Sequence, residues 1–226
     1  MLVIAIDGTA GSGKSTLARR IARHLGYKYI DSGAMYRVVS WAALHRGIEL
    51  DDADALGALA RSLKIDIENN EDGGIPRFLI DGTDVSEEIR TPEASQAASS
   101  VAAVSEVREA MVEQQRRLGR RGGVVMEGRD IGTVVLPDAD VKFFLDARLP
   151  IRAQRRKDEL IERGIEQSLE SVIEELRRRD TRDSTREDSP LRRAQDAVLF
   201  DTSDKSLDRL EADMLHVIES KTGRKV

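Results

Sequence analysis

Gly8-Thr9-Ala10-Gly11-Ser12-Gly13-Lys14-Ser15-Thr16 is the stretch that decides the fold of this chain. An apolar segment of strand type, residues 2–6, precedes it, and a segment of helix type, residues 17–25, follows it. In this strand–turn–helix setting, glycines let successive backbone N–H groups point at phosphate oxygens, and the helix N-terminus adds partial positive charge. The pattern therefore predicts a phosphate-binding loop.

Two side chains of this loop have chemistry of their own. Lys14 can reach the β- and γ-phosphates of a nucleoside triphosphate, and the Ser15 hydroxyl is placed to bind Mg²⁺. The alternative is an ordinary Gly/Ser-rich turn, which requires neither the Lys-Ser pair nor the flanking strand and helix. We therefore predict that the chain binds a nucleoside triphosphate together with Mg²⁺.

The composition sets the class of protein. The chain has 226 residues, 40% hydrophobic and 34% charged, which is typical of a soluble globular domain. Apolar runs stay well short of the ~20 residues of a membrane helix, and the first strand leaves no room for a signal peptide. Cysteine is absent, and the net charge of −5 disfavours broad nucleic-acid binding. We expect a cytoplasmic protein with no membrane or nucleic-acid partner.

Short apolar segments alternate with segments of helical periodicity along most of the chain. This alternation predicts an α/β fold with a parallel five-stranded sheet covered on both faces. The strands are expected at 2–6, 27–31, 123–127, 141–145 and 197–201. The helices are expected at 14–25, 34–46 (capped by Ser32), 91–118 (started by Thr91-Pro92-Glu93), 149–163, 168–180 and 204–219.

One stretch breaks the alternation. Residues 64–68 and 77–80 read as antiparallel strands joined by a turn, which predicts a small inserted subdomain over 63–104. Residues 182–190 contain no apolar side chain and are expected to form a mobile, solvated loop. The remaining segments, 1–62, 105–150 and 191–226, would form the core of a single domain, 1–226.

Charged residues follow two of the expected strands. Glu127-Gly128-Arg129-Asp130 and Asp31-Ser32-Gly33-Ala34-Met35-Tyr36-Arg37 stand at carboxyl strand ends, the edge where parallel sheets bind ligands. Arg179, Arg182 and Arg186 recur at helical spacing further along. Arginine forks suit phosphate recognition. The alternatives are a surface Arg–Asp pair, a capping serine and a solvated helix end.

Taken together, these strings resemble the bacterial cytidylate kinases. The resemblance rests on the phosphate loop, Asp31 to Arg37, Glu127-Gly128-Arg129-Asp130-Ile131-Gly132-Thr133-Val134-Val135, the arginine-rich run 179–186 and Asp201-Thr202-Ser203. It runs in order over essentially the whole chain. Thr9-Ala10 is a departure, because the family pattern has a proline beside the first loop glycine; this affects loop stiffness rather than a ligand group.

The resemblance implies a P-loop fold with two mobile inserts. Residues 63–104 would be the nucleoside monophosphate-binding insert, and 151–190 would be a helical lid. The implied reaction is transfer of the γ-phosphoryl group of ATP to CMP or dCMP with Mg²⁺, giving ADP and CDP or dCDP. A phosphate monoester is largely dianionic at neutral pH, so the acceptor needs no protein base.

The resemblance also implies roles for individual residues. Lys14 and the loop Gly8–Thr16 would hold the triphosphate, Ser15 the metal, and Asp183 the ribose hydroxyls. The acceptor phosphate would be held by Arg37, Arg129 and Arg179, with Ser32 beside it among the substrate-binding residues. The cytosine would be read by Ser99, Arg108, Asp130 and Arg186. The lid would bring Arg152, Arg155 or Arg156 over the triphosphate.

Other classes of protein fit less well. A GTPase-type switch needs an Asn-Lys-x-Asp string, and the chain has no Asn-Lys pair. A nucleic-acid-binding ATPase needs a broad basic surface. Among kinases, UMP, AMP or shikimate as acceptor is the nearest alternative. We expect a monomer.

Overall fold

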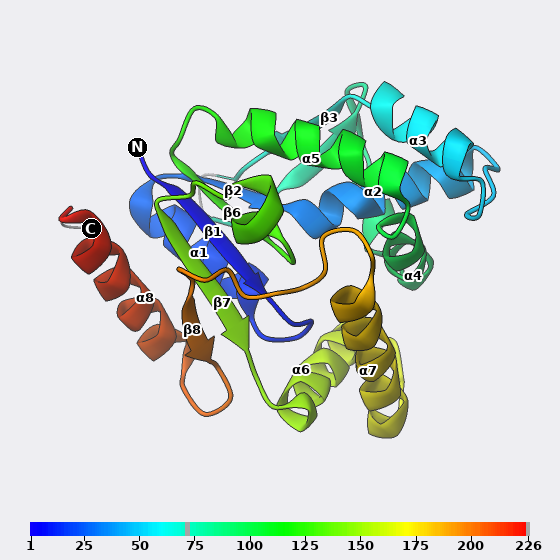
Figure 1. Cartoon of the computed structure of the whole chain (residues 1–226). Coiled ribbons are helices and arrows are strands. Elements are labelled where there is room, and N and C mark those ends of the chain that lie inside the picture. Colours follow the sequence, from blue (N-terminus) through cyan, green and yellow to red (C-terminus); the bar gives the residue numbers. More distant parts are fainter. Residues whose placement is uncertain (71–72, 225–226) are drawn as a thin grey trace.

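The structure is a computed structural model that describes residues 1–70 and 73–224. Five parallel strands form its central sheet in the order β2-β6-β1-β7-β8 (Figure 1). The strands are β1 (Val3–Gly8), β2 (Lys28–Asp31), β6 (Val124–Gly128), β7 (Val141–Asp146) and β8 (Val198–Asp201). β1 lies between β6 and β7, so its apolar residues are buried on both faces of the sheet, which explains its uninterrupted hydrophobic run.

Helices cover both faces of this sheet, as predicted. On one face α1 (Lys14–Leu25) and α8 (Leu207–Thr222) pack on Ile4, Ile6 and Phe143. On the other face α2 (Ser32–His45) and α5 (Ser105–Gly119) pack on Ala5, Val124 and Met126. The carboxyl ends of the strands of this sheet point toward the helices α6 (Leu149–Glu162) and α7 (Leu169–Thr185) (Figure 1).

The predicted antiparallel strands form a second sheet. It has the order β3-β4-β5, with β3 (Ile65–Glu68), β4 (Arg77–Ile80) and the short β5 (Thr83–Asp84). A 3-10 turn, η1 (Glu88–Arg90), and α4 (Pro92–Val101) follow, and the Thr91 hydroxyl accepts from the Ala94 N–H as expected of a helix cap. The buried side chains of Phe78 and Ile80 join this sheet to the core around α2.

Helices α6 (Leu149–Glu162) and α7 (Leu169–Thr185) form a hairpin that extends from the carboxyl end of β7 (Figure 1). An apolar cluster of its own, Ala153, Leu160, Val172 and Leu176, holds the two helices together, and Ala10 of the phosphate loop joins it. The hairpin is thereby tied to the loop that precedes α1.

Four local predictions were wrong. An unpredicted helix, α3 (Ala53–Ser62), follows Asp52, whose carboxylate caps it. The helix expected over 91–118 is two helices, because the chain breaks at 102–104 between α4 and α5. Asp31, rather than Ser32, caps α2, since its carboxylate accepts from the Ala34 N–H.

The fourth wrong prediction concerns the segment 182–190, which was expected to be a mobile loop. Its first part belongs to α7, which continues to Thr185. Asp183 is 9% exposed and faces inward, so charge pairing takes the place of an apolar stripe there.

Candidate functional site

The phosphate loop begins at the end of β1. Gly8 has φ 148° and lies so close to β7 that a Cβ on it would stand 1.9 Å from the Leu145 carbonyl oxygen. A side chain there is sterically excluded, and the chain can turn away from the sheet only with glycine at this position. The loop then closes on itself through Ser12, whose hydroxyl donates to the Thr9 carbonyl at 2.9 Å.

Lys14 is the first residue of α1 and is buried. Its Nζ donates to the Thr9 carbonyl at 2.7 Å, so the ammonium lies across the mouth of the loop. Burial, together with the positive charge of Arg129, lowers the pKa of Lys14 to about 7. A bound triphosphate would supply the opposite charge that this site lacks.

Ser15 lies beside an acidic group that the sequence prediction omitted. Its hydroxyl donates to Glu127 Oε1 at 2.5 Å, and the Tyr29 hydroxyl donates to the same oxygen at 3.2 Å. Burial and the nearby Asp31 carboxylate raise the pKa of Glu127. A hydroxyl and a carboxylate side by side are oxygen ligands of the kind that Mg²⁺ takes together with waters and phosphates.

A fully protein-made metal site is absent from the described residues: 1–70 and 73–224 contain no group of three or more His, Cys, Asp or Glu placed to hold an ion. Ser15 and Glu127 could supply two oxygen ligands to Mg²⁺, and phosphates and waters would complete its coordination.

Three arginines expected to hold the acceptor phosphate surround the ends of β2 and β6. Arg129 Nε donates to Asp183 Oδ2 at 2.8 Å, and Arg37 Nη2 donates to Asp31 Oδ2 at 2.9 Å. Arg179, from α7, is half-buried close to both; desolvation and the charge of Arg129 lower its pKa to about 10. The cluster carries more positive charge than its carboxylates neutralise, which suits a dianionic phosphate.

Three of the four residues expected to read the base, Arg108, Asp130 and Arg186, lie together. Asp130 is buried, its Oδ2 accepts a short hydrogen bond from Arg108 Nη2, and its Oδ1 lies 3.7 Å from Arg186 Nη2. Within the described residues, Ser99 Oγ, Arg108 Nε and Arg186 Nη2 are buried without a hydrogen-bond partner. Buried polar atoms are rarely left unpaired, so the two arginine atoms beside Asp130 mark a place for a polar ligand.

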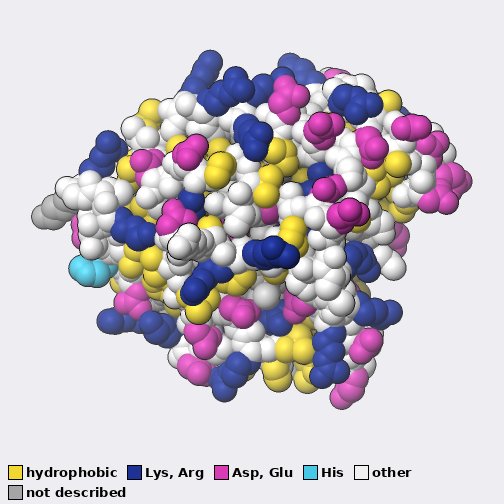
Figure 2. Space-filling model, viewed as in Figure 1, with side chains coloured by type: hydrophobic (Ala, Val, Ile, Leu, Met, Phe, Trp, Pro, Cys, Tyr) yellow, Lys and Arg dark blue, Asp and Glu magenta, His cyan; other side chains and the backbone are white. Residues whose placement is uncertain are grey.

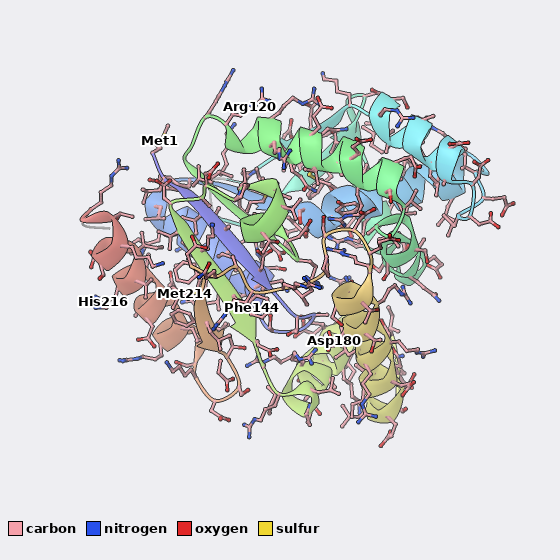
Figure 3. The ribbon with its side chains drawn as sticks, in the orientation of Figure 1. Met1, Arg120, Phe144, Asp180, Met214 and His216 are labelled. Atoms are coloured by element: carbon pink, nitrogen blue, oxygen red, sulfur yellow. The ribbon has the colours of Figure 1, made fainter. Side chains whose placement is uncertain are left out.

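The lid arginines have different surroundings. Arg152 is buried; it donates to the Ala147 and Ala10 carbonyls at 2.8 and 3.1 Å and pairs with Asp180 at 2.8 Å. Asp180 lies on α7 where the hairpin meets the rest of the molecule (Figure 3). Arg152 therefore fixes the lid to the phosphate loop.

Arg155 and Arg156 lie three and four residues after Arg152, about one turn further along α6. Arg155 donates to the Thr202 hydroxyl and carbonyl at 3.1 and 2.6 Å, and the Thr202 hydroxyl donates to the Ser12 carbonyl. Arg156 pairs with the exposed Glu159 at 3.3 Å, a weak surface interaction that leaves it able to turn toward a ligand.

The residues outside the site carry both signs of charge. Figure 2 shows Lys and Arg interspersed with Asp and Glu over the face that it presents. Within the part of the chain that the structure describes, no helix has the length and apolar composition needed to cross a bilayer.

Sequence reasoning missed three residues of the site. Asp31 and Glu127 were quoted only as neighbours of other residues. Asp31 is the last residue of β2 and Glu127 the last but one of β6, at the ligand edge of the sheet, which was a usable signal. Thr202, which links Arg155 to the phosphate loop, is distant in the chain, and only the fold brings it there.

The fold and the chemistry of this site are those of a P-loop nucleoside monophosphate kinase. The sequence profile of the cytidylate kinase family matches residues 4–220. The chain is 46% identical over 221 residues to the cytidylate kinase of Bacillus subtilis, covering 98% of both chains. It is 47% identical over 216 residues to that of Exiguobacterium sibiricum, covering 96% of both. The chain belongs to the cytidylate kinase family.

Two further comparisons add context. The chain is 49% identical over 207 residues to the bifunctional pantoate ligase/cytidylate kinase of Trichormus variabilis, matching 91% of this chain and 39% of that protein. An uncharacterized protein of known structure from Eubacterium ventriosum shares the fold, with a TM-score of 0.54 at 10% identity over 97% of this chain and 99% of that one.

Proposed function

We propose that this protein transfers the γ-phosphoryl group of ATP to CMP or dCMP. The observation that carries the proposal is the position of Asp130 between Arg108 and Arg186, with Arg108 Nε and Arg186 Nη2 buried and without a hydrogen-bond partner among the described residues. Cytosine offers an amino donor and two acceptors on its pairing edge. One carboxylate and two arginines form the complementary set.

Lys14 and the loop around it would hold the donor. Its Nζ leaves the Thr9 carbonyl and pairs with the β- and γ-phosphates, which compensates for the burial of the amine. Ser15 and Glu127 would hold Mg²⁺, which neutralises phosphate charge when it is bound. Gly8 to Thr16 would supply the backbone N–H groups.

Arg37, Arg129 and Arg179 would hold the acceptor phosphate in line with the γ-phosphorus. An acceptor phosphate oxygen forms the new P–O bond as the bond to the β-phosphate oxygen breaks, and ADP leaves. The acceptor oxygen carries no proton at neutral pH, so no side chain has to remove one. The arginines act by positioning two anions that otherwise repel each other.

Asp130 would discriminate between bases. Its carboxylate accepts from the cytosine amino group, while uracil would present a carbonyl oxygen to it and leave two acceptors opposed. A buried acceptor without a donor costs enough to reject the wrong base. Asp183 and Ser32 would complete the site at the ribose and phosphate.

In this proposal the two inserts close over the two substrates. Residues 63–104 would close on CMP, and 151–190 would bring Arg156 over the triphosphate, with Arg152 and Arg155 anchoring the lid, so that water is excluded as a competing acceptor. The core is then 1–62, 105–150 and 191–226. All these groups come from one chain, so we also propose a monomer. We propose that it acts in the cytoplasm, a reducing compartment that suits a chain without cysteine.

ADP release measured with ATP, Mg²⁺ and a panel of acceptors tests the proposal. CMP and dCMP should be phosphorylated with kcat/KM at least tenfold, on the order of 1.4 kcal/mol, above UMP, AMP and shikimate. A higher value for UMP, AMP or shikimate would refute it.

A further inference from the structure

Asp7 is a buried acid that the proposed reaction does not use. It stands next to the last residue of β1 and is 3% exposed. Its Oδ1 accepts from the Ile131 N–H and its Oδ2 from the Gly132 N–H, each at 2.7 Å. These amides begin η2 (Ile131–Val135), a single π-helical turn that follows Asp130.

Asp130 itself occupies the position from which an aspartate commonly caps the turn that follows it. It makes no such bond; its carboxylate faces Arg108 and Arg186 instead. The first N–H groups of a helical turn need an acceptor, and here a carboxylate from a different strand provides it. The cap from β1 leaves the Asp130 carboxylate available to the arginines.

The start of η2 lies directly against Asp7. A Cβ on Gly132 would be in van der Waals contact with Asp7 Oδ2, at 3.4 Å, and would lie 3.1 Å from Lys142 Cδ. Both carboxylate oxygens are used, one for each amide. An isosteric amide would keep one acceptor and turn a donor toward the other N–H.

We infer that Asp7 is a positioning residue for base recognition, which caps η2 from β1 and so keeps the Asp130 carboxylate directed at the base. The inference rests on the proposed role of Asp130 in reading cytosine. It adds a specificity determinant that lies outside the base site and does not touch the substrate.

The substitution Asp7→Asn tests this inference. Without the second acceptor, η2 shifts and the Asp130 carboxylate can turn back to cap it, so the CMP/UMP ratio of kcat/KM should fall about tenfold. A merely structural role would lower the melting temperature and leave this ratio unchanged. Tyr27→Phe is the matched control, because it removes the hydroxyl that accepts from the Leu2 N–H at the opposite end of β1. The CMP/UMP ratio of this variant should stay at the wild-type value.

A double-mutant cycle with Asp130→Asn separates this inference from the proposed function. If Asp7 acts through Asp130, adding Asp7→Asn to Asp130→Asn should change the ratio less than about twofold. If the changes that the two substitutions make in the CMP/UMP ratio multiply in the double variant, the two residues act independently and the inference is overturned. A lowered ratio in Asp130→Asn together with a wild-type ratio in Asp7→Asn would overturn it as well. An unchanged ratio in Asp130→Asn alone would overturn the proposed role of Asp130 as well.

Asp7→Glu keeps the inference testable if Asp7→Asn does not fold. The longer side chain keeps a carboxylate but displaces it by one methylene group from the Ile131 and Gly132 N–H groups, so the CMP/UMP ratio of kcat/KM should fall about threefold. A folded Asp7→Glu protein with the wild-type ratio would contradict the inference.

Discussion

Arg129 Nε lies 2.8 Å from Asp183 Oδ2, which joins the segment after β6 to the C-terminal turns of α7. Burial alone would raise the pKa of Asp183, but the charges of Arg129 and Arg179 hold it below its usual value. The carboxylate is therefore ionised throughout the neutral range. In the proposed function it would accept from the ribose hydroxyls once Arg129 turns to the acceptor phosphate.

Asp183→Asn should raise KM for CMP about tenfold, with a smaller change in KM for ATP, because an amide is a weaker acceptor and leaves Arg129 uncompensated. Steady-state kinetics with each substrate varied in turn gives both constants. The control is Asp208→Asn, which breaks an exposed ion pair between Asp208 of α8 and Arg20 of α1. Equal increases in both KM values would argue against a role at the ribose.

Lys14→Ala should leave the fold intact and lower kcat about 10²- to 10³-fold, because the ammonium stabilises phosphate charge rather than the core. Turnover at saturating ATP, together with a thermal melt, checks both statements. Wild-type turnover would remove Lys14 from the mechanism.

Binding of ATP at pH 8 should be accompanied by proton uptake. The pKa of Lys14 is lowered to about 7 in the free protein, so the amine is mostly neutral at pH 8, and the triphosphate restores its positive charge. Calorimetric titrations in two buffers of different ionisation enthalpy should give different heats, and Lys14→Met should abolish the difference. Equal heats for the wild type would contradict the expectation.

CMP and ATP should protect different segments. Residues 63–104 form the small sheet with α4, whereas 149–190 contain the hairpin of α6 and α7, anchored to the phosphate loop through Arg152. Hydrogen exchange with each ligand alone should show slower exchange in 63–104 with CMP and in 149–190 with ATP. Equal protection of 63–104 by ATP alone would refute this assignment of the inserts.

The sequence predicted the parts of the fold that depend on local pattern. The five parallel strands, the phosphate loop and the antiparallel insert strands were all expected, because strand periodicity and glycine spacing are properties of short segments. Asp52 with Leu56, Leu59 and Ala60 carries a cap and helical spacing, so α3 could have been found the same way.

Other features depend on contacts between distant segments. The break at 102–104 contains no glycine or proline, and the continuation of α7 to Thr185 is polar throughout, with Asp183 held by Arg129. The capping of η2 by Asp7 joins residues 124 and 125 positions apart. No local sequence pattern predicts such pairs, because only the fold brings the two residues together.

The ratio of kcat/KM for CMP over UMP, compared between the wild type and Asp130→Asn, tests the central claim most directly. An amide can donate to the uracil carbonyl, so the ratio should fall about tenfold or more while the rate with CMP also falls, because the amide's donor end cannot pair with the cytosine amino group. A fixed ratio accompanied by a lower melting temperature would show that Asp130 is a scaffold residue, and that base reading rests on Ser99, Arg108 and Arg186 without it.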